Sequence, residues 1–222
     1  MKAIFSLIII LISTLLSQAQ TATKNSLIVD QIVATINGEP ITQSDIVWAL
    51  VLDPSIDEGS ISGQNYREML ERLIDQRLFL SEAARIPNIL PTQADISREI
   101  GVLIKQFSSE DDFYKRIRKY GINAETLIDL IGKRLLILNY IDFRFRSFAI
   151  ITDEEIQNYF QNILKPKLSV SGKRTGETPT EKERSLIEQI LIEEKVDKEI
   201  EKFLENSRQR ADISLLTDIE KE

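Results

Sequence analysis

A tight turn near the start of the chain constrains the fold more than any other feature. Residues 29–36 form an apolar-rich run with β-branched side chains, and Asn37-Gly38 follows it directly. Asn-Gly suits a type I′ hairpin turn, because both central residues of that turn need positive φ. The return strand must be short and lie at a sheet edge, since Pro40 has no backbone N–H to donate. The stretch predicts a β-hairpin.

Helical signals dominate the rest of the chain. Thr42 is a hydroxyl N-cap with Asp45 three residues later, a near match to the capping box, and Thr152 with Glu155 is a full one. Gly121 suits the left-handed position that ends a helix. Apolar spacing predicts helices after Thr42 and over residues 64–85, 93–107, 111–120, 124–148, 154–164 and 181–210.

Composition limits the chemistry open to this chain. Its 222 residues are 42% hydrophobic and 28% charged, which is typical of a globular protein of one or two domains. It has no Cys and no His, which excludes thiol nucleophiles, Ser-His-Asp catalysis and most zinc sites. The net charge of −7 repels phosphate backbones, so nucleic acid is not an expected partner. We expect no catalytic residue, no metal and no cofactor.

The N-terminus predicts export. Lys2 precedes a mostly apolar run, 3–16, which is short for a membrane span of about 20 residues but suits a secretory signal. Ser17-Gln18-Ala19 is a small-x-small cleavage site. We expect residues 1–19 to be removed after Ala19, leaving no stable membrane insertion. Retention of this segment as an anchor is the alternative.

Several segments resemble the SurA family of periplasmic chaperones. The opening segment matches at Val29-Asp30, Ile32-Val33-Ala34, Ile36-Asn37-Gly38-Glu39, Ile41-Thr42 and Ser44-Asp45-Ile46. The central segments match at Gly121-Ile122-Asn123, Leu127, Ile131, Leu135 to Ile137, Ile141, Ile151-Thr152-Asp153-Glu154-Glu155-Ile156 and Tyr159-Phe160. The tail matches at Phe203, Leu204, Arg208, Ala211, Ile213 and Leu215. The likeness is to the N-terminal domain of the family and covers most of 28–164 and 181–216.

The resemblance implies how the two ends of the chain meet. In the family, the strand after the last helix, here 211–216, pairs near the N-terminal hairpin. Such pairing would cover the otherwise exposed edge of 29–36, which is a physical reason to expect it. The expected fold is mainly α: a bundle of about six helices with a small antiparallel β-sheet formed by the N-terminal hairpin and the C-terminal strand.

The chain departs from the family pattern after residue 164. There the family carries a parvulin-type prolyl isomerase domain with a histidine-containing site. Here residues 165–180, KPKLSVSGKRTGETPT, form a linker too short for that domain. The predicted organisation is a signal peptide (1–19), a disordered lead-in (20–27), a helical domain (28–164), the linker (165–180), a helix and strand that complete the same domain (181–216), and a tail (217–222).

Aromatic side chains are the candidate contacts for a bound polypeptide. In 139–148, NYIDFRFRSF, aromatic residues alternate with Arg144 and Arg146. Core packing, with arginine stems lying on apolar surface, is the alternative interpretation. The candidate peptide-binding residues are Trp48, Tyr114, Tyr120, Tyr140, Phe143, Phe145 and Phe148.

The function implied by the resemblance is a periplasmic holdase, a chaperone that binds unfolded, in particular outer-membrane, polypeptides through an apolar and aromatic surface. A chaperone that binds unfolded chains shifts their folding equilibrium by mass action, and this requires no catalytic group. Two alternatives stay open: a peptidyl-prolyl isomerase by family membership, and a periplasmic adaptor with one specific partner. The sequence leaves the oligomeric state and the identity of the clients open.

Overall fold

The computed structural model describes residues 30–57, 63–170 and 176–216. The predicted signal peptide (1–19), lead-in (20–27) and tail (217–222) lie outside the described residues, as does the cleavage site at Ala19. The expectations for those segments therefore remain predictions.

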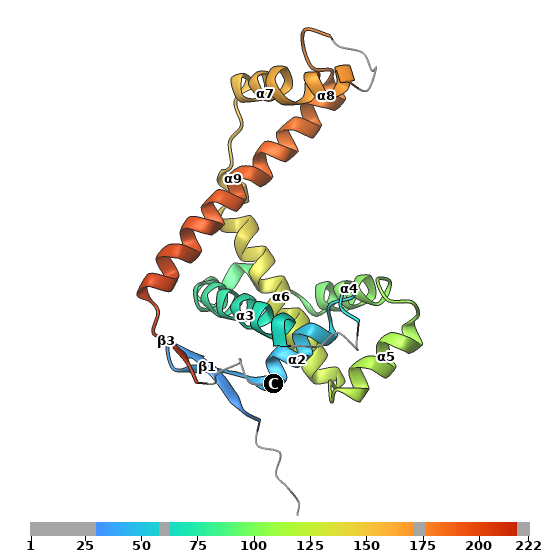
Figure 1. The fold of residues 1–222 in the computed structure, drawn as a ribbon, viewed down its shortest axis with the longest axis vertical. Helices are drawn as coiled ribbons and strands as arrows, with labels where there is room; N and C mark the ends of the chain where they lie inside the picture. The colour runs from blue at the N-terminus through green and yellow to red at the C-terminus, as the bar shows by residue number, and fades with distance from the viewer. Residues whose placement is uncertain (1–29, 58–62, 171–175, 217–222) are drawn as a thin grey trace, which may run out of the picture. The chain divides into compact units, whose positions relative to one another are not determined.

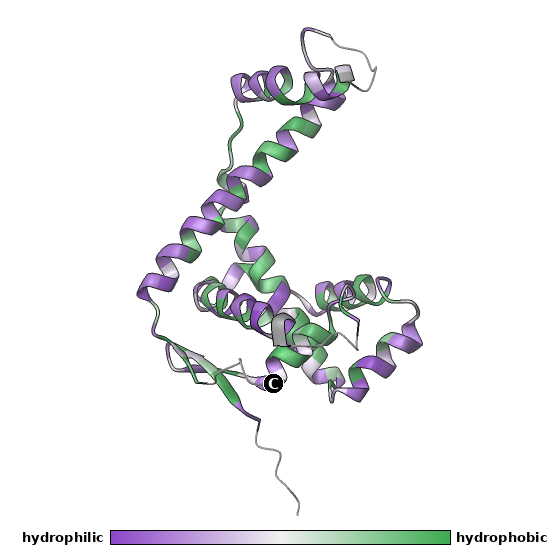
Figure 2. Ribbon diagram, in the orientation of Figure 1, coloured by the Kyte–Doolittle hydropathy of each residue, from purple (hydrophilic) through white to green (hydrophobic). Residues whose placement is uncertain are grey.

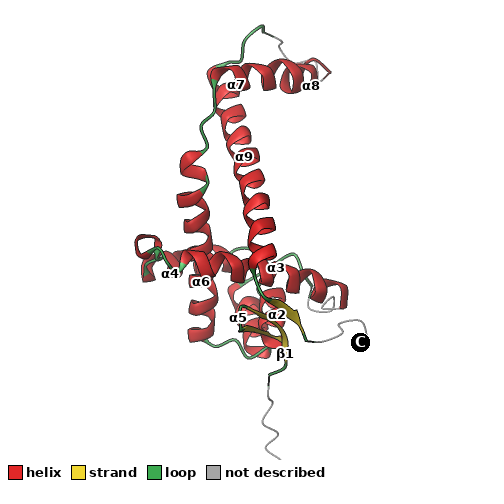
Figure 3. Ribbon diagram, turned by 90° about the vertical axis from the view of Figure 1, so that its left-hand side faces the viewer, coloured by secondary structure: helices red, strands yellow, loops and turns green. Residues whose placement is uncertain are grey.

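The described chain is mainly α-helical, as predicted (Figures 1 and 3). In chain order its elements are β1 (Ile32–Ile36), β2 (Glu39–Thr42), α2 (Gln43–Val51), α3 (Gly63–Ala83), the 3₁₀ turn η2 (Pro87–Ile89), α4 (Gln93–Ile104), α5 (Glu110–Lys119), α6 (Ala124–Arg144), the 3₁₀ turn η3 (Arg146–Phe148), α7 (Asp153–Tyr159), the π-helical turn η4 (Phe160–Leu164), α8 (Lys165–Val170), α9 (Glu181–Arg210) and β3 (Ile213–Leu215).

The two ends of the described chain meet in a three-stranded antiparallel sheet of order β2-β1-β3. Asn37 and Gly38 have φ of 51° and 84°, the positive values that a type I′ turn requires. Ile213 lies opposite Ile36, and the Asn37 N–H donates to the Asp212 carbonyl at 2.8 Å. The predicted pairing of hairpin and C-terminal strand is confirmed, and Pro40 lies in an edge strand.

Local capping defines the helix ends. Thr42, Thr92, Thr152 and Thr180 each accept from the backbone N–H three residues later, and the side chain at that third position accepts from the threonine N–H. These reciprocal bonds satisfy N–H groups that the first turn of a helix leaves unpaired. At the end of α5, Gly121 takes the left-handed conformation, with φ of 76°.

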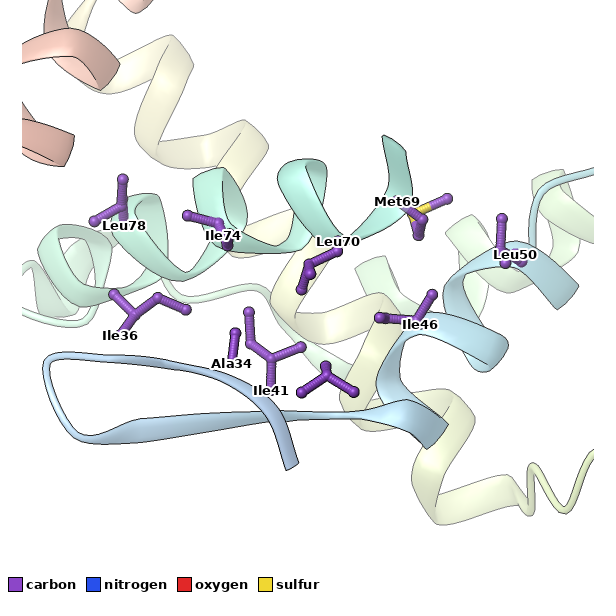
Figure 4. Packing of buried hydrophobic residues seen from close by; sticks show 10 residues of the cluster. Ala34, Ile36, Ile41, Ile46, Leu50, Met69, Leu70, Ile74 and Leu78 are labelled. Atoms are coloured by element: carbon purple, nitrogen blue, oxygen red, sulfur yellow. The ribbon is translucent and has the colours of Figure 1, made fainter. Parts of the chain in front are cut away.

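The first core cluster joins the sheet to α2 and α3. Figure 4 shows Ala34, Ile36 and Ile41 from the hairpin pointing at Leu70, Ile74 and Leu78 on α3. Leu204, Ala211 and Ile213, from the end of α9 and from β3, pack against the same cluster. One face of the sheet is therefore buried by helices that follow the hairpin (α2 and α3) and by the end of α9, which precedes β3.

Three further clusters hold the helices together. One joins α2, α4, α5 and α6 around Phe113; another joins α3, α6 and α9 around Phe79 and Tyr140; the last joins α7, η4 and the start of α9 around Phe160. The apolar stripe of α9 rotates around its axis because its ends pack in different clusters: Ile187 in the last, and Phe203 in the one around Phe79. The helix therefore packs against different partners at its two ends.

Two predicted boundaries are wrong. Residues 165–170, assigned to the linker, form α8. They continue the preceding helical segment through a π-turn, in which the Lys165 N–H donates to the Phe160 carbonyl. Pro166 has no N–H for the α-helical ladder, which accounts for an irregularity at this place. The helix predicted over 124–148 ends at Arg144, and Arg146–Phe148 form a separate 3₁₀ turn.

Candidate polypeptide-binding surface

The structure divides the seven predicted aromatic residues among different environments. Trp48, Tyr114 and Tyr120 are partly buried against the cluster around Phe113. The Trp48 indole N–H donates to the Tyr120 carbonyl at 3.0 Å, so its polar atom is used within the fold. These three side chains hold α2 and α5 together.

The aromatic residues of 140–148 separate into a packed pair and an exposed pair. Tyr140 is only 4% exposed and packs edge-to-face on Phe79, so for this residue the core-packing interpretation holds and the predicted binding role does not. Phe145 is half-buried, with its ring centroid 5.8 Å from that of Phe203. Phe143 and Phe148, by contrast, are 49% and 70% exposed.

Phe148 lies in a groove of about 510 Å³, which we call the α9 groove. Its lining comes from the segment that leads from α6 towards α7 and from α9. Figures 1 and 2 show the course of these two segments, with a largely hydrophobic stretch between α6 and α7. Ile150, 78% exposed, lines it beside Phe148. Its full lining is Arg144, Phe145, Phe148, Ala149, Ile150, Lys195, Lys198, Glu199 and Lys202.

Ion pairs fix the two walls of the α9 groove. Arg146 donates to both carboxylate oxygens of Glu193, at 2.6 and 2.9 Å, and to Asp142 at 2.8 Å. These bonds raise the pKa of Arg146 and lower that of Glu193. Lys195 donates to the Ile150 carbonyl at 2.6 Å and pairs with Glu155 at 2.7 Å. Backbone and side-chain bonds thus hold Phe148 and Ile150 beside α9.

A second groove, of about 400 Å³, lies among α2, α3, α4 and α6. Trp48, Leu73 and Leu130 contribute to its apolar lining. Its charged side chains largely neutralise one another, with Arg77 on Asp45 at 3.3 Å and Lys133 on Asp129 at 2.6 Å. None of its lining residues is a strongly exposed large hydrophobic residue, unlike those of the α9 groove.

Sequence reasoning missed Ile150 and the lysines of α9. The apolar run from Phe148 to Ile151, placed between a helix and a capping box, was a signal that could have indicated an exposed Ile150. The spacing of Lys195, Lys198 and Lys202 indicates a shared helix face, but only the tertiary fold shows that this face lines the groove.

The described residues hold no other chemistry that would define a site. Among them, no group of three or more His, Cys, Asp or Glu side chains could hold a metal ion. Within the same ranges, no helix is both long enough and apolar enough to cross a membrane.

Comparison with known proteins finds similarity at the level of structure and none at the level of sequence. No protein-family model matches the sequence, and no curated protein is detectably similar to it. The structure is similar to a chain from a study of the virulence factor PEB4 and the periplasmic protein Cj1289 of Campylobacter jejuni, described as two structurally related SurA-like chaperones. The match covers 84% of this chain and 99% of that chain, with a TM-score of 0.48 and 14% identity.

Acid should weaken the contact between α7 and α9 through Glu155. Hydrogen bonds from Lys195 and Thr152 lower the pKa of Glu155 from 4.5 to about 2. Because the folded pKa is the lower one, the stabilisation is complete above pH 4.5 and is lost as the pH falls towards 2. We expect Glu155→Gln to speed amide exchange in α7 at pH 6, and this difference from the wild type to vanish near pH 2.

Hydrogen–deuterium exchange of α7, with α4 as an internal reference, measures this effect. Glu154→Gln, at the exposed neighbouring position, is the matched control and should leave the α7 rates close to those of the wild type. An effect of Glu155→Gln that is equally large at both pH values would show that the charge of Glu155 is not what holds α7 to α9.

Proposed function

We propose that this protein is a periplasmic chaperone that holds unfolded polypeptides, in particular outer-membrane proteins, without catalysis. The observation that carries the proposal is the α9 groove, in which Phe148 and Ile150 present apolar side chains to solvent at 70% and 78% exposure. Clustered exposed apolar side chains mark interaction sites in soluble proteins.

The chemistry of the α9 groove suits holding better than tight, specific binding. Its apolar contacts are non-directional, so many sequences can use them, and it is open at the surface of the protein. Binding the unfolded state of a client reduces the free concentration of aggregation-prone chains by mass action. The sequence resemblance to SurA-type chaperones supports the periplasmic location and the outer-membrane client class.

Light scattering tests the proposal. An outer-membrane β-barrel protein unfolded in urea is diluted into buffer with increasing amounts of this protein, or with equal amounts of an inert globular protein as a control. We expect scattering to fall as this protein is added and to stay unchanged in the control. Equal aggregation in both series would contradict the holding role.

Two assays address the alternatives. A protease-coupled assay on a proline-containing peptide should show no isomerisation above the uncatalysed rate, and clear turnover would replace the proposal by a prolyl isomerase. Pull-down from a periplasmic extract should recover a range of unfolded proteins. Recovery of one stoichiometric partner would favour an adaptor.

A further inference from the structure

Three lysines of α9 line one wall of the α9 groove. Lys195, Lys198 and Lys202 are spaced by three and four residues, which places them on one side of a helix. Glu194 and Glu201 each directly precede one of these lysines, so they are rotated about 100° from the lysines around the axis of α9. Neither glutamate lines the groove. The α9 wall is therefore basic, although the chain as a whole carries a net charge of −7.

Arg144 adds a fourth cation from the opposite wall, at the end of α6. Its guanidinium group lies 6.0 Å from the ring centroid of Phe145, so the positive charge sits beside the apolar lining. Glu199 is the single carboxylate in the lining. The groove thus combines four cations and one anion with the exposed side chains of Phe148 and Ile150.

Two of the four cations are already neutralised by partners within the fold. Lys195 pairs with Glu155 at 2.7 Å, and Lys202 pairs with Glu199 at 2.7 Å. Neither Arg144 nor Lys198 forms an ion pair with another residue of the described ranges. Two positive charges therefore remain to interact with a ligand.

We infer that the α9 groove selects extended polypeptide segments in which acidic residues flank apolar or aromatic ones. The inference rests on the proposed holding function and names the class of segment held. The apolar side chains would contact Phe148 and Ile150, and the carboxylates would lie against Arg144 and Lys198. The repulsion from the chain's net negative charge is screened beyond about 8 Å at physiological salt, so the cations next to the ligand dominate.

The volume of the α9 groove favours a polypeptide segment over a broad anionic surface. About 510 Å³ is within the range of pockets that enclose a small ligand, and so suits a few side chains of a bound segment. Phe145 and Ala149 also contribute to its lining, so carboxylates alone would leave the apolar lining unfilled. A ligand that carries both apolar and acidic side chains fills it.

Fluorescence anisotropy with two labelled peptides tests the inference on the full-length protein. The peptides share one phenylalanine and one isoleucine two positions apart, flanked by glutamates in one peptide and by glutamines in its twin. At low salt we expect the acidic peptide to bind about three- to tenfold more tightly, because each partly exposed ion pair contributes modestly. High salt should remove this difference while leaving the binding of the glutamine twin nearly unchanged.

Two variants test whether the preference for the acidic peptide arises in the α9 groove. Arg144→Gln with Lys198→Gln should bring the affinity for the acidic peptide down to that for its twin. Lys182→Gln removes the same charge from the same helix about 24 Å away along its axis, and should leave the preference intact.

The results distinguish a failure of the charge selectivity from a failure of the proposed holding function. Equal affinity of the wild-type protein for both peptides would overturn the charge selectivity and leave the holding role standing. Binding of neither peptide would contradict the holding role at this groove as well. Anionic lipid vesicles that bind through Arg144 and Lys198 and displace the acidic peptide would make the groove a membrane contact and overturn the inference.

Discussion

Replacing Phe113 by alanine should lower the free energy of unfolding by about 3–5 kcal/mol, the usual cost of removing a buried phenylalanine side chain. Phe113 is fully buried in the cluster that joins α2, α4, α5 and α6. Its ring makes edge-to-face contacts with Phe107 and Tyr114, each with centroids 5.2 Å apart. Alanine would leave a cavity where these helices meet, and the lost contacts have no replacement.

Urea unfolding followed by circular dichroism measures the effect. Phe143→Ala is the matched control, because the same atoms are removed from a side chain that is 49% exposed on α6. That variant should change the free energy of unfolding by less than about 1 kcal/mol. Similar losses for the two variants would contradict the assignment of Phe113 to the centre of the core.

Replacing both Phe148 and Ile150 by serine should raise the amount of protein needed to suppress client aggregation by about tenfold or more. Both side chains are exposed in the free protein, and each would lose contact with water when a client covers it. Truncating them removes the two exposed apolar side chains that line the α9 groove without adding charge. The unfolding free energy should stay nearly unchanged, since neither side chain packs in a core cluster.

The matched control truncates two exposed apolar residues outside the groove. Leu90→Ser with Leu186→Ser removes side chains that lie near η2 and at the start of α9. This variant should protect the client as well as the wild type does. Equal protection by the groove variant would move the client-binding site elsewhere, and equal loss in both would show that exposed apolar area matters irrespective of its place.

Sequence reasoning predicted the elements well where the determining contacts are local. Thr152 and Glu155 exchange bonds across three residues, and Asn37-Gly38 forms its turn within four, so those signals can be read without the rest of the fold. The helix over 181–210 was predicted from its apolar spacing with the bounds that the structure has, and the structure shows Thr180 capping its start. The strand pairing needed the family resemblance in addition.

The candidate site was predicted only in part. Phe143 and Phe145 are two residues apart in the same arginine-rich segment, yet the first is exposed and the second packs on Phe203 of α9. Burial of this kind depends on a helix about 60 residues later in the chain, which helical periodicity does not reveal. Tyr140 was predicted to lie on the binding surface because its packing against distant helices could not be read from the sequence. It lies in the core.

The sequence by itself determined the turn, the caps, the helices and the absence of histidine and cysteine chemistry, because each of these depends on residue type and on neighbours within a few positions. Only the tertiary structure decided which aromatic side chains stay exposed and that Phe148 and Ile150 lie opposite the lysines of α9. The physical reason is that burial and groove formation are set by contacts between segments far apart in the chain, and those contacts exist only once the helices have packed.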